Sequence, residues 1–117
     1  MKLQFDAQQL RVRIDEDELA ALLRGQPVDA ATQAGETFAL RLALQLHPFD
    51  EAHLEGPAAR CQLHLPEAPV RELAGRLPTR EGLRFAIAGT SAAGTLAVLF
   101  DVDVRDSARR LKASRKA

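Results

Sequence analysis

The sequence predicts an α+β fold, with six mostly antiparallel strands in a twisted sheet or partly closed barrel and two short helices against one side. Three observations predict this class. The chain has 117 residues, of which 46% are hydrophobic and 27% charged, as is typical of one globular domain. Six segments alternate apolar and polar residues with the period of a half-buried strand. Two further segments have the helical spacing of apolar residues, and the first of them also has helix-capping residues.

The six expected strands follow directly from the alternation with period two. They lie at residues 3–5, 10–14, 38–46, 61–65, 83–87 and 96–104. The last of them is the most hydrophobic, so we expect it at the centre of the sheet. Residues 26–36 contain Pro, Asp, Thr and Gly and predict a loop, while residues 47–57 predict a turn-rich connection.

Each of the two expected helices begins where a strand ends. Asp15 is the expected N-cap of the first helix, and Glu18 lies three residues later, as a capping box requires. Gly25 follows the last apolar residue and is expected to end this helix in the left-handed conformation. The second helix is expected to begin near Pro66, which places Pro69 in its first turn, where proline is tolerated.

The two strand-to-helix junctions resemble each other. A shift of 51 residues places Val12 on Leu63 and Ile14 on Leu65, and it aligns the apolar helix positions as well. Each half therefore has the order strand, helix, loop, strand. Two explanations stay open at this point: an internal duplication, or the convergence of two amphipathic junctions that obey the same packing rules.

Charge is distributed unevenly along the chain, although the net charge is zero. Residues 1–104, the expected α+β domain, hold 10 basic and 15 acidic residues, whereas residues 105–117 hold six basic residues and one acidic residue. This basic tail is expected to be a frayed terminus or a short helix. The alternative is that it binds a polyanion. The residues that would do so are Arg109, Arg110, Lys112, Arg115 and Lys116.

The order of several short motifs resembles a known family. These are the opening Met-Lys, then LRVRID (10–15), ELAALLRGQPV (18–28) and LHLPEAPVRELA (63–74). The pattern is similar to that of a family of small bacterial proteins of uncharacterised function, which have a Met-Lys strand, an L-R-x-R strand and a short helix ending in Gly. The resemblance implies the fold. It implies no activity, because these motifs serve structure rather than chemistry.

Two of the three histidines lie close together in the sequence HPFDEAH. His47, Asp50 and His53 are residue types that ligate metal ions, so they are the candidates for a metal site. However, Pro48 and the turn-rich composition provide no helical spacing that would place them on one face. We therefore expect solvated loop residues here, and neither a metal ion nor a cofactor.

Four other polar residues are candidates for a ligand site. Arg41, His64, Arg84 and Asp101 would line a pocket if the fold gathered them into one concavity. Arg41 is instead expected to face outward between two alanines. His64 lies on the face of its strand opposite to Cys61, so the two residues cannot form a nucleophile–base pair. Cys61 is the only cysteine and is expected to be a buried thiol.

Two arginines and two aspartates share the same spacing on polar strand faces. Arg11 and Arg13 alternate with apolar residues in one strand, and Asp101 and Asp103 do so in the last strand. If these strands are neighbours, we expect a ladder of opposite charges between them, in which each pair contributes up to about 1 kcal/mol.

The sequence therefore leans away from an enzyme. We expect a non-catalytic binding or protein-interaction domain, and Ala97 and Leu99, which are apolar on an otherwise polar face, favour a homodimer. Two alternatives stay open: a small-ligand-binding or enzymatic barrel with a polar pocket, and nucleic-acid association through the basic tail, which we do not expect. The longest uncharged run has 16 residues, too few to span a bilayer, and no secretory segment is evident. We expect a soluble, cytoplasmic protein.

Overall fold

The computed structural model describes residues 1–87 and 94–104, which contain two α-helices and eight strands. In chain order the elements are β1 (Lys2–Asp6), β2 (Gln9–Ile14), α1 (Glu16–Leu23), β3 (Val28–Ala34), β4 (Phe38–His47), β5 (His53–Glu55), a 3₁₀ turn (Ala58–Arg60), β6 (Cys61–Pro66), α2 (Glu67–Gly75), β7 (Leu83–Ile87) and β8 (Leu96–Val102).

The strands form two mixed sheets of four strands each. Sheet A has the order β1-β2-β8-β7, and sheet B has the order β3-β4-β6-β5. In each sheet the two central strands run parallel, and each edge strand runs antiparallel to its neighbour. The α+β class and the two short helices are confirmed, as is the interior position of β8. The expectation of six strands in one sheet or a partly closed barrel is wrong, because β3 and β5 are also strands and the sheets do not close.

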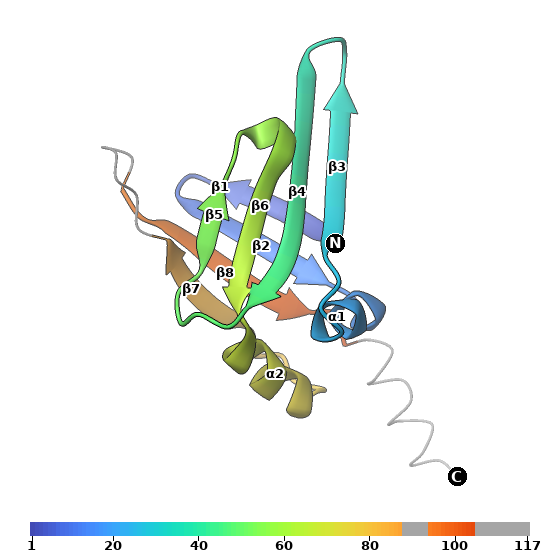
Figure 1. The fold of residues 1–117 in the computed structure, drawn as a ribbon, viewed down its shortest axis with the longest axis vertical. Coiled ribbons are helices and arrows are strands. Elements are labelled where there is room, and N and C mark those ends of the chain that lie inside the picture. Colours follow the sequence, from blue (N-terminus) through green and yellow to red (C-terminus); the bar gives the residue numbers. More distant parts are fainter. Residues whose placement is uncertain (88–93, 105–117) are drawn as a thin grey trace.

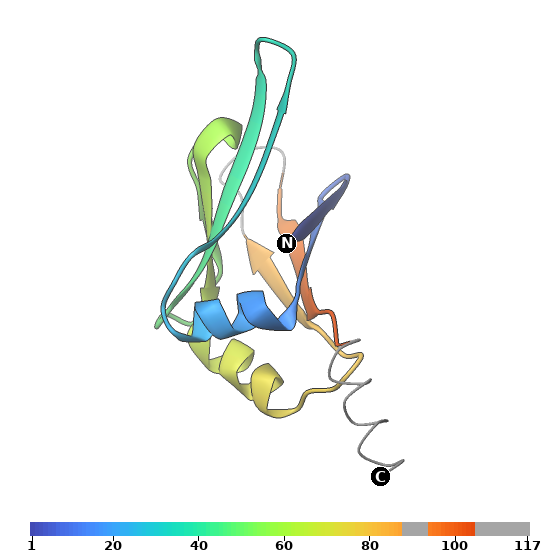
Figure 2. The same cartoon turned by 90° about the vertical axis from the view of Figure 1, so that its right-hand side faces the viewer.

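The two sheets lie face to face as two layers, and α1 and α2 lie together at one end of them (Figures 1 and 2). Helix α1 connects β2 of sheet A to β3 of sheet B, and α2 connects β6 of sheet B back to β7 of sheet A. The sheets diverge away from the helices, and the β3–β4 hairpin projects beyond the rest of the described chain (Figure 2). The layers therefore form a wedge that the helices close.

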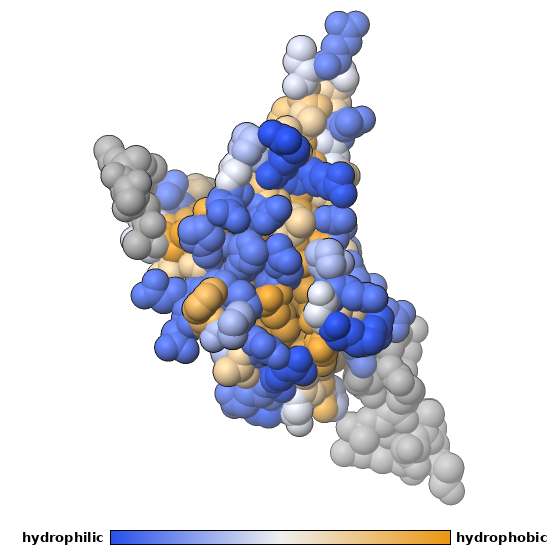
Figure 3. All heavy atoms as spheres, in the orientation of Figure 1, coloured by the Kyte–Doolittle hydropathy of each residue, from blue (hydrophilic) through white to orange (hydrophobic). Residues whose placement is uncertain are grey.

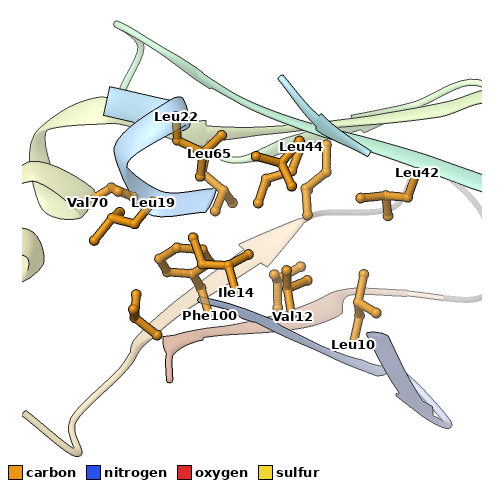
Figure 4. Packing of buried hydrophobic residues seen from close by; sticks show 14 of the residues in the cluster. Leu10, Val12, Ile14, Leu19, Leu22, Leu42, Leu44, Leu65, Val70 and Phe100 are labelled. Carbon is orange, nitrogen blue, oxygen red and sulfur yellow. The ribbon is translucent and has the colours of Figure 1, made fainter. Parts of the chain in front are cut away.

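The core fills the space between the sheets. Val12 and Phe100 of sheet A point toward Leu42 and Leu44 of sheet B, and all four are at most 1% exposed (Figure 4). Leu19 of α1 lies at the helical end of this core. Since side chains alternate along a strand, the polar residues between these apolar ones lie on the outer faces of the two sheets. Any chemistry on the sheets must therefore be sought there.

Local signals set the helix boundaries as the sequence predicts. The Asp15 carboxylate accepts a hydrogen bond of 2.7 Å from the Glu18 backbone N–H, and the Glu18 carboxylate accepts one of 3.0 Å from the Asp15 N–H. Gly25 follows the helix with a φ of +85°, in the left-handed region. Helix α2 begins directly after Pro66, with Pro69 in its first turn.

The two halves of the chain have the same order of elements: two strands, a helix and two more strands. Each sheet takes its first hairpin from one half and its second hairpin from the other. Lys2 is opposite Arg13 in the β1–β2 hairpin, and His53 is opposite His64 in the β5–β6 hairpin, so both positions of the pair differ by the 51 residues of the sequence shift. The similarity of the two junctions in sequence thus has a counterpart in strand pairing.

Candidate functional site

Three histidines from three strands meet on the outer face of sheet B. His47 is the last residue of β4, His53 is the first of β5, and His64 lies in β6. His53 is directly opposite His64 across the antiparallel β5–β6 pair. The ring centroids of His47 and His64 are 5.6 Å apart, and those of His53 and His64 are 6.2 Å apart. The chain has three histidines in all, so every one of them belongs to this cluster.

The cluster borders an open depression of about 430 Å³, which we call the histidine hollow. It is lined by His47, Phe49, Glu51, Ala52, His53 and His64. The ring of Phe49 meets that of His47 edge to face, with centroids 5.3 Å apart, although Phe49 is 69% exposed. The face of the molecule on which sheet B lies is largely hydrophilic (Figure 3). The hollow therefore combines imidazoles, a carboxylate and one exposed aromatic ring.

Two glutamates contact the imidazoles. The His47 Nε2–H donates a hydrogen bond of 2.6 Å to the backbone carbonyl of Glu51. The two carboxylate oxygens of Glu55 face different rings: Oε2 lies 3.4 Å from His53 Nε2, and Oε1 lies 3.6 Å from His64 Nε2. Because His47 donates from Nε2, its neutral form keeps the lone pair on Nδ1.

The two opposite imidazoles differ in their exposure to solvent. The His64 side chain is 19% exposed, whereas the His53 side chain is 61% exposed, so the pair offers one sheltered and one accessible ring. Neutral imidazoles and carboxylates are ligands for metal ions and partners for polar ligands. As the side chains stand, residues 1–87 and 94–104 contain no group of three or more His, Cys, Asp or Glu arranged to hold a metal ion.

The expected candidate set of His47, Asp50 and His53 differs from the observed cluster. His47 and His53 belong to strands and not to a solvated loop, because β5 follows the turn after β4. Asp50 does not line the histidine hollow; it lines a neighbouring hollow of about 410 Å³ together with Arg84. His64, from a third strand, joins the two histidines instead.

The cluster was missed because it depends on strand pairing. The triplet His53-Leu54-Glu55 alternates polar and apolar residues, which is the signal that could have predicted β5. With β5 and β6 paired, Glu55 and both histidines would have been placed on one face. Sequence reasoning instead treated this segment as part of a long turn.

The four residues expected to form a ligand pocket do not gather in one place. Arg41 and His64 belong to sheet B, while Arg84 and Asp101 belong to sheet A. Arg41 is exposed, as expected, and its guanidinium lies 3.3 Å from the Asp29 carboxylate. The pocket hypothesis for this set is wrong, because the residues come from the outer faces of two different layers.

The predicted charge ladder is confirmed for Arg11, Arg13 and Asp101. Strands β2 and β8 are parallel neighbours, with Arg13 opposite Asp101. The Arg13 Nε lies 2.8 Å from Asp101 Oδ1, and the Arg11 Nε lies 4.0 Å from Asp101 Oδ2. Asp103 follows the end of β8, and its backbone N–H donates a hydrogen bond of 2.8 Å to the Ile14 carbonyl.

Cys61 is buried on the inner face of β6, as predicted, while His64 of the same strand faces the hollow. The thiol donates a hydrogen bond of 3.1 Å to the Arg41 carbonyl. Burial raises the pKa of the Cys61 thiol above its ordinary value, and a hydrogen bond from its own backbone offsets part of this rise. The thiol therefore stays protonated at neutral pH, which makes it a poor nucleophile.

One prediction from the sequence falls outside the described residues. It is the basic tail with Arg109, Arg110, Lys112, Arg115 and Lys116.

Comparison with known proteins gave no match to a family model, a curated protein or a solved structure. Within the described part of the chain, neither helix has the length and apolar character needed to cross a membrane.

Proposed function

We propose that this chain is a binding domain without catalytic activity, and that its ligand occupies the histidine hollow. The observation that carries this proposal is the convergence of His47, His53 and His64 from three strands, with the carboxylate of Glu55 facing two of the rings. Groups that can bind a polar ligand therefore gather at this place on the outer face of sheet B.

The difference between the inner and outer faces of the sheets supports this proposal. Among the described residues, every fully enclosed side chain is apolar and none is polar or charged. The inner faces serve packing, so the outer faces are free to vary with function. Corresponding positions of the two hairpins illustrate this. Arg13 in β2 corresponds to His64 in β6, and both lie next to buried positions of their strands, yet the two residue types differ.

The position of Cys61 supports the absence of catalysis. A thiol nucleophile requires a base within hydrogen-bonding distance and a thiolate that forms readily. Cys61 is buried, its pKa is raised by burial, and it hydrogen-bonds to the carbonyl of Arg41 rather than to an imidazole. The hollow is lined by imidazoles and one carboxylate, and its lining residues include no hydroxyl or thiol nucleophile.

Ligand binding can be tested by recording amide and imidazole NMR spectra while a library of metal ions, anions and small polar molecules is titrated. A ligand of the hollow should shift the signals of His47, His53 and His64, and His64→Ala should abolish the shifts. Gln62→Ala, on the same strand and exposed, is the matched control and should leave them intact. If no compound perturbs the histidines, or if both variants behave alike, the proposal is wrong.

The internal repeat supports a further proposal about origin: the fold derives from a duplicated strand–helix–strand module. The pairs related by the 51-residue shift, such as Val12 with Leu63 and Ile14 with Leu65, are buried in both copies. Convergence accounts for apolar positions, but it provides no reason for the same offset in both strands of the paired hairpins.

Other expectations from the sequence stay predictions. A homodimer through the outer face of sheet A would be tested by light scattering at micromolar concentration; Leu99 is half-buried there, with Arg11 and Arg84 as its register neighbours. Polyanion binding by the tail predicts a steep salt dependence that is lost on truncation after Val104. Membership of the small bacterial family and a cytoplasmic location likewise stay predictions.

A further inference from the structure

We propose that His53, Glu55 and His64 ligate a divalent transition-metal ion of the zinc class at the histidine hollow. This inference rests on the proposed binding function and specifies its ligand. The set suggested by the sequence was His47, Asp50 and His53. The set proposed here consists of three residues that the β5–β6 pairing places on one face.

Strand pairing supplies the placement. His53 and His64 are directly opposite each other in the antiparallel pair, and Glu55 follows His53 by two residues, on the same face. Side chains at opposite positions are the closest neighbours across a sheet, and diagonal positions remain within reach of long side chains. Three ligating groups therefore start from rigid backbone positions instead of a mobile loop.

Taken pair by pair, the distances from the Glu55 carboxylate to the two rings are close to those between neighbouring metal ligands. Glu55 Oε2 lies 3.4 Å from His53 Nε2, and Glu55 Oε1 lies 3.6 Å from His64 Nε2. With metal–ligand bonds of about 2.0–2.2 Å in a tetrahedral site, neighbouring ligand atoms are about 3.4 Å apart. Both separations are long for a hydrogen bond, which is strongest at about 2.7–3.2 Å. An ion between the carboxylate and the rings would replace two weak contacts with direct bonds.

Side-chain rotation is still required, because no three ligating side chains of the described residues are arranged around one point as they stand. His53 and Glu55 are more than half exposed, so rotation of these two side chains meets little steric resistance. His64 is more sheltered, and its ring stacks on that of His47 with an interplanar angle of 25°. His47 in turn is held by its hydrogen bond to the Glu51 carbonyl. We assign His47 as a positioning residue that orients His64.

The donor set indicates which ions bind. Two imidazole nitrogens and one carboxylate suit Zn²⁺, Ni²⁺, Co²⁺ and Cu²⁺, whereas Mg²⁺ and Ca²⁺ prefer sites made of oxygen ligands. Three protein ligands leave a fourth tetrahedral position for water or an added ligand. We therefore expect selectivity for transition metals over Mg²⁺, with a stoichiometry of one ion per chain.

The test is isothermal titration calorimetry of the untagged full chain with Zn²⁺ at neutral pH, supported by the visible absorption of Co²⁺, which reports its coordination geometry. His64→Ala and Glu55→Gln should each weaken Zn²⁺ binding by more than about 10-fold, because even partners of the ligands commonly contribute about 10- to 100-fold. His47→Ala should reduce the affinity less than His64→Ala does. Thermal melts of each variant establish that it is folded.

Asp50→Asn is the matched control for Glu55→Gln, since Asp50 lies in the neighbouring hollow. It should bind Zn²⁺ as the unmodified chain does. The inference is overturned if Asp50→Asn removes binding while Glu55→Gln leaves it intact, because the loop set would then be the site. It is also overturned if Zn²⁺ at 100-fold molar excess gives no heat and no Co²⁺ spectrum develops.

The outcome separates this inference from the proposed function. If an anion or organic compound shifts the histidine NMR signals while Zn²⁺ and Co²⁺ do not, the metal assignment is wrong and the binding domain stands. If neither metal ions nor other compounds shift those signals, both proposals are overturned.

Discussion

The wedge shape of the fold can be tested with two leucines of one strand. Leu40 and Leu44 are four residues apart in β4, so their side chains leave the same face of the strand. Leu44 is opposite Val28 and is 0% exposed between the two sheets. Leu40 is opposite Thr32, nearer to the turn of the β3–β4 hairpin, and is only half-buried. The same change, leucine to alanine, thus probes two depths of one apolar row.

The expected costs differ because a cavity forms only at the enclosed position. Truncation of a buried leucine to alanine lowers the free energy of unfolding by about 2–5 kcal/mol, through lost transfer energy and the cavity left behind. Leu44→Ala should therefore remove a large share of a total stability that is about 5–15 kcal/mol for a domain of this kind. Leu40→Ala should cost about 1 kcal/mol or less, since part of that side chain already contacts water.

Equilibrium unfolding in urea, followed by far-ultraviolet circular dichroism, measures both values with the same m-value analysis. The midpoint should shift strongly for Leu44→Ala and slightly for Leu40→Ala, with little change in slope. Equal losses would refute the reasoning, because they would mean that the outer half of the hairpin is packed as tightly as the core. A loss below about 1 kcal/mol for Leu44→Ala would refute the placement of this residue between two layers.

Three further predictions follow from local geometry. Gly82→Ala should destabilise the fold, because the added Cβ would lie 2.5 Å from a backbone carbonyl oxygen. Gly75→Ala, whose Cβ would have nothing within 4 Å, should be neutral or stabilising. Similar melting temperatures of the two variants would contradict this prediction. Asp15→Ala should cost about 1 kcal/mol through loss of the capping box and Asp17→Ala less, as urea unfolding would show; equal costs would argue against a cap. The raised pKa of Cys61 predicts that the free energy of unfolding falls as the pH rises above the ordinary thiol range, because the unfolded chain releases the thiol proton first. In Cys61→Ala this part of the pH dependence should be lost. Alkylation of Cys61 in the native protein at pH 8 as fast as in urea would contradict its burial.

Alternation with period two predicted most strands because burial on one face and exposure on the other is a property of each strand by itself. In β2, Leu10, Val12 and Ile14 are buried while the arginines between them are exposed, as the sequence indicates. The start of the helix at Asp15 and its end at Gly25 could be predicted equally well, because caps depend on contacts within a few residues. These features needed no knowledge of distant neighbours.

Two strands escaped prediction, one because its residues favour strand only weakly and the other because it has only three residues. The sequence of β3 is VDAATQA, in which Val28 is buried and most of the remaining residues are small or polar and exposed. It forms a strand because seven successive register pairs join it to β4. The three residues of β5 are held in the same way by β6. Pairing with a strongly apolar partner overrides weak local preference.

The assembly of two sheets also lay beyond sequence reasoning. Six strands could be arranged in one sheet or a barrel with equal justification, since alternation states which side of a strand is buried and not which strand lies beside it. The central parallel pairs join β2 to β8 and β4 to β6, across large distances in the sequence. For the same reason, the meeting of His64 with His53 could not be read from spacing, although each residue was recognised as a candidate.

The repeat connects the fold with the candidate site. The shift of 51 residues relates Lys2 and Arg13 of the first hairpin to His53 and His64 of the second, and in both hairpins these residues are opposite each other. The inner positions are apolar in both hairpins, whereas the outer pair is basic in one and imidazole in the other. Both hairpins need apolar residues at their inner positions to keep the fold. The outer pair is therefore where the sequence can change without loss of the fold. A binding site is expected to develop at such a position, and the histidine hollow lies there.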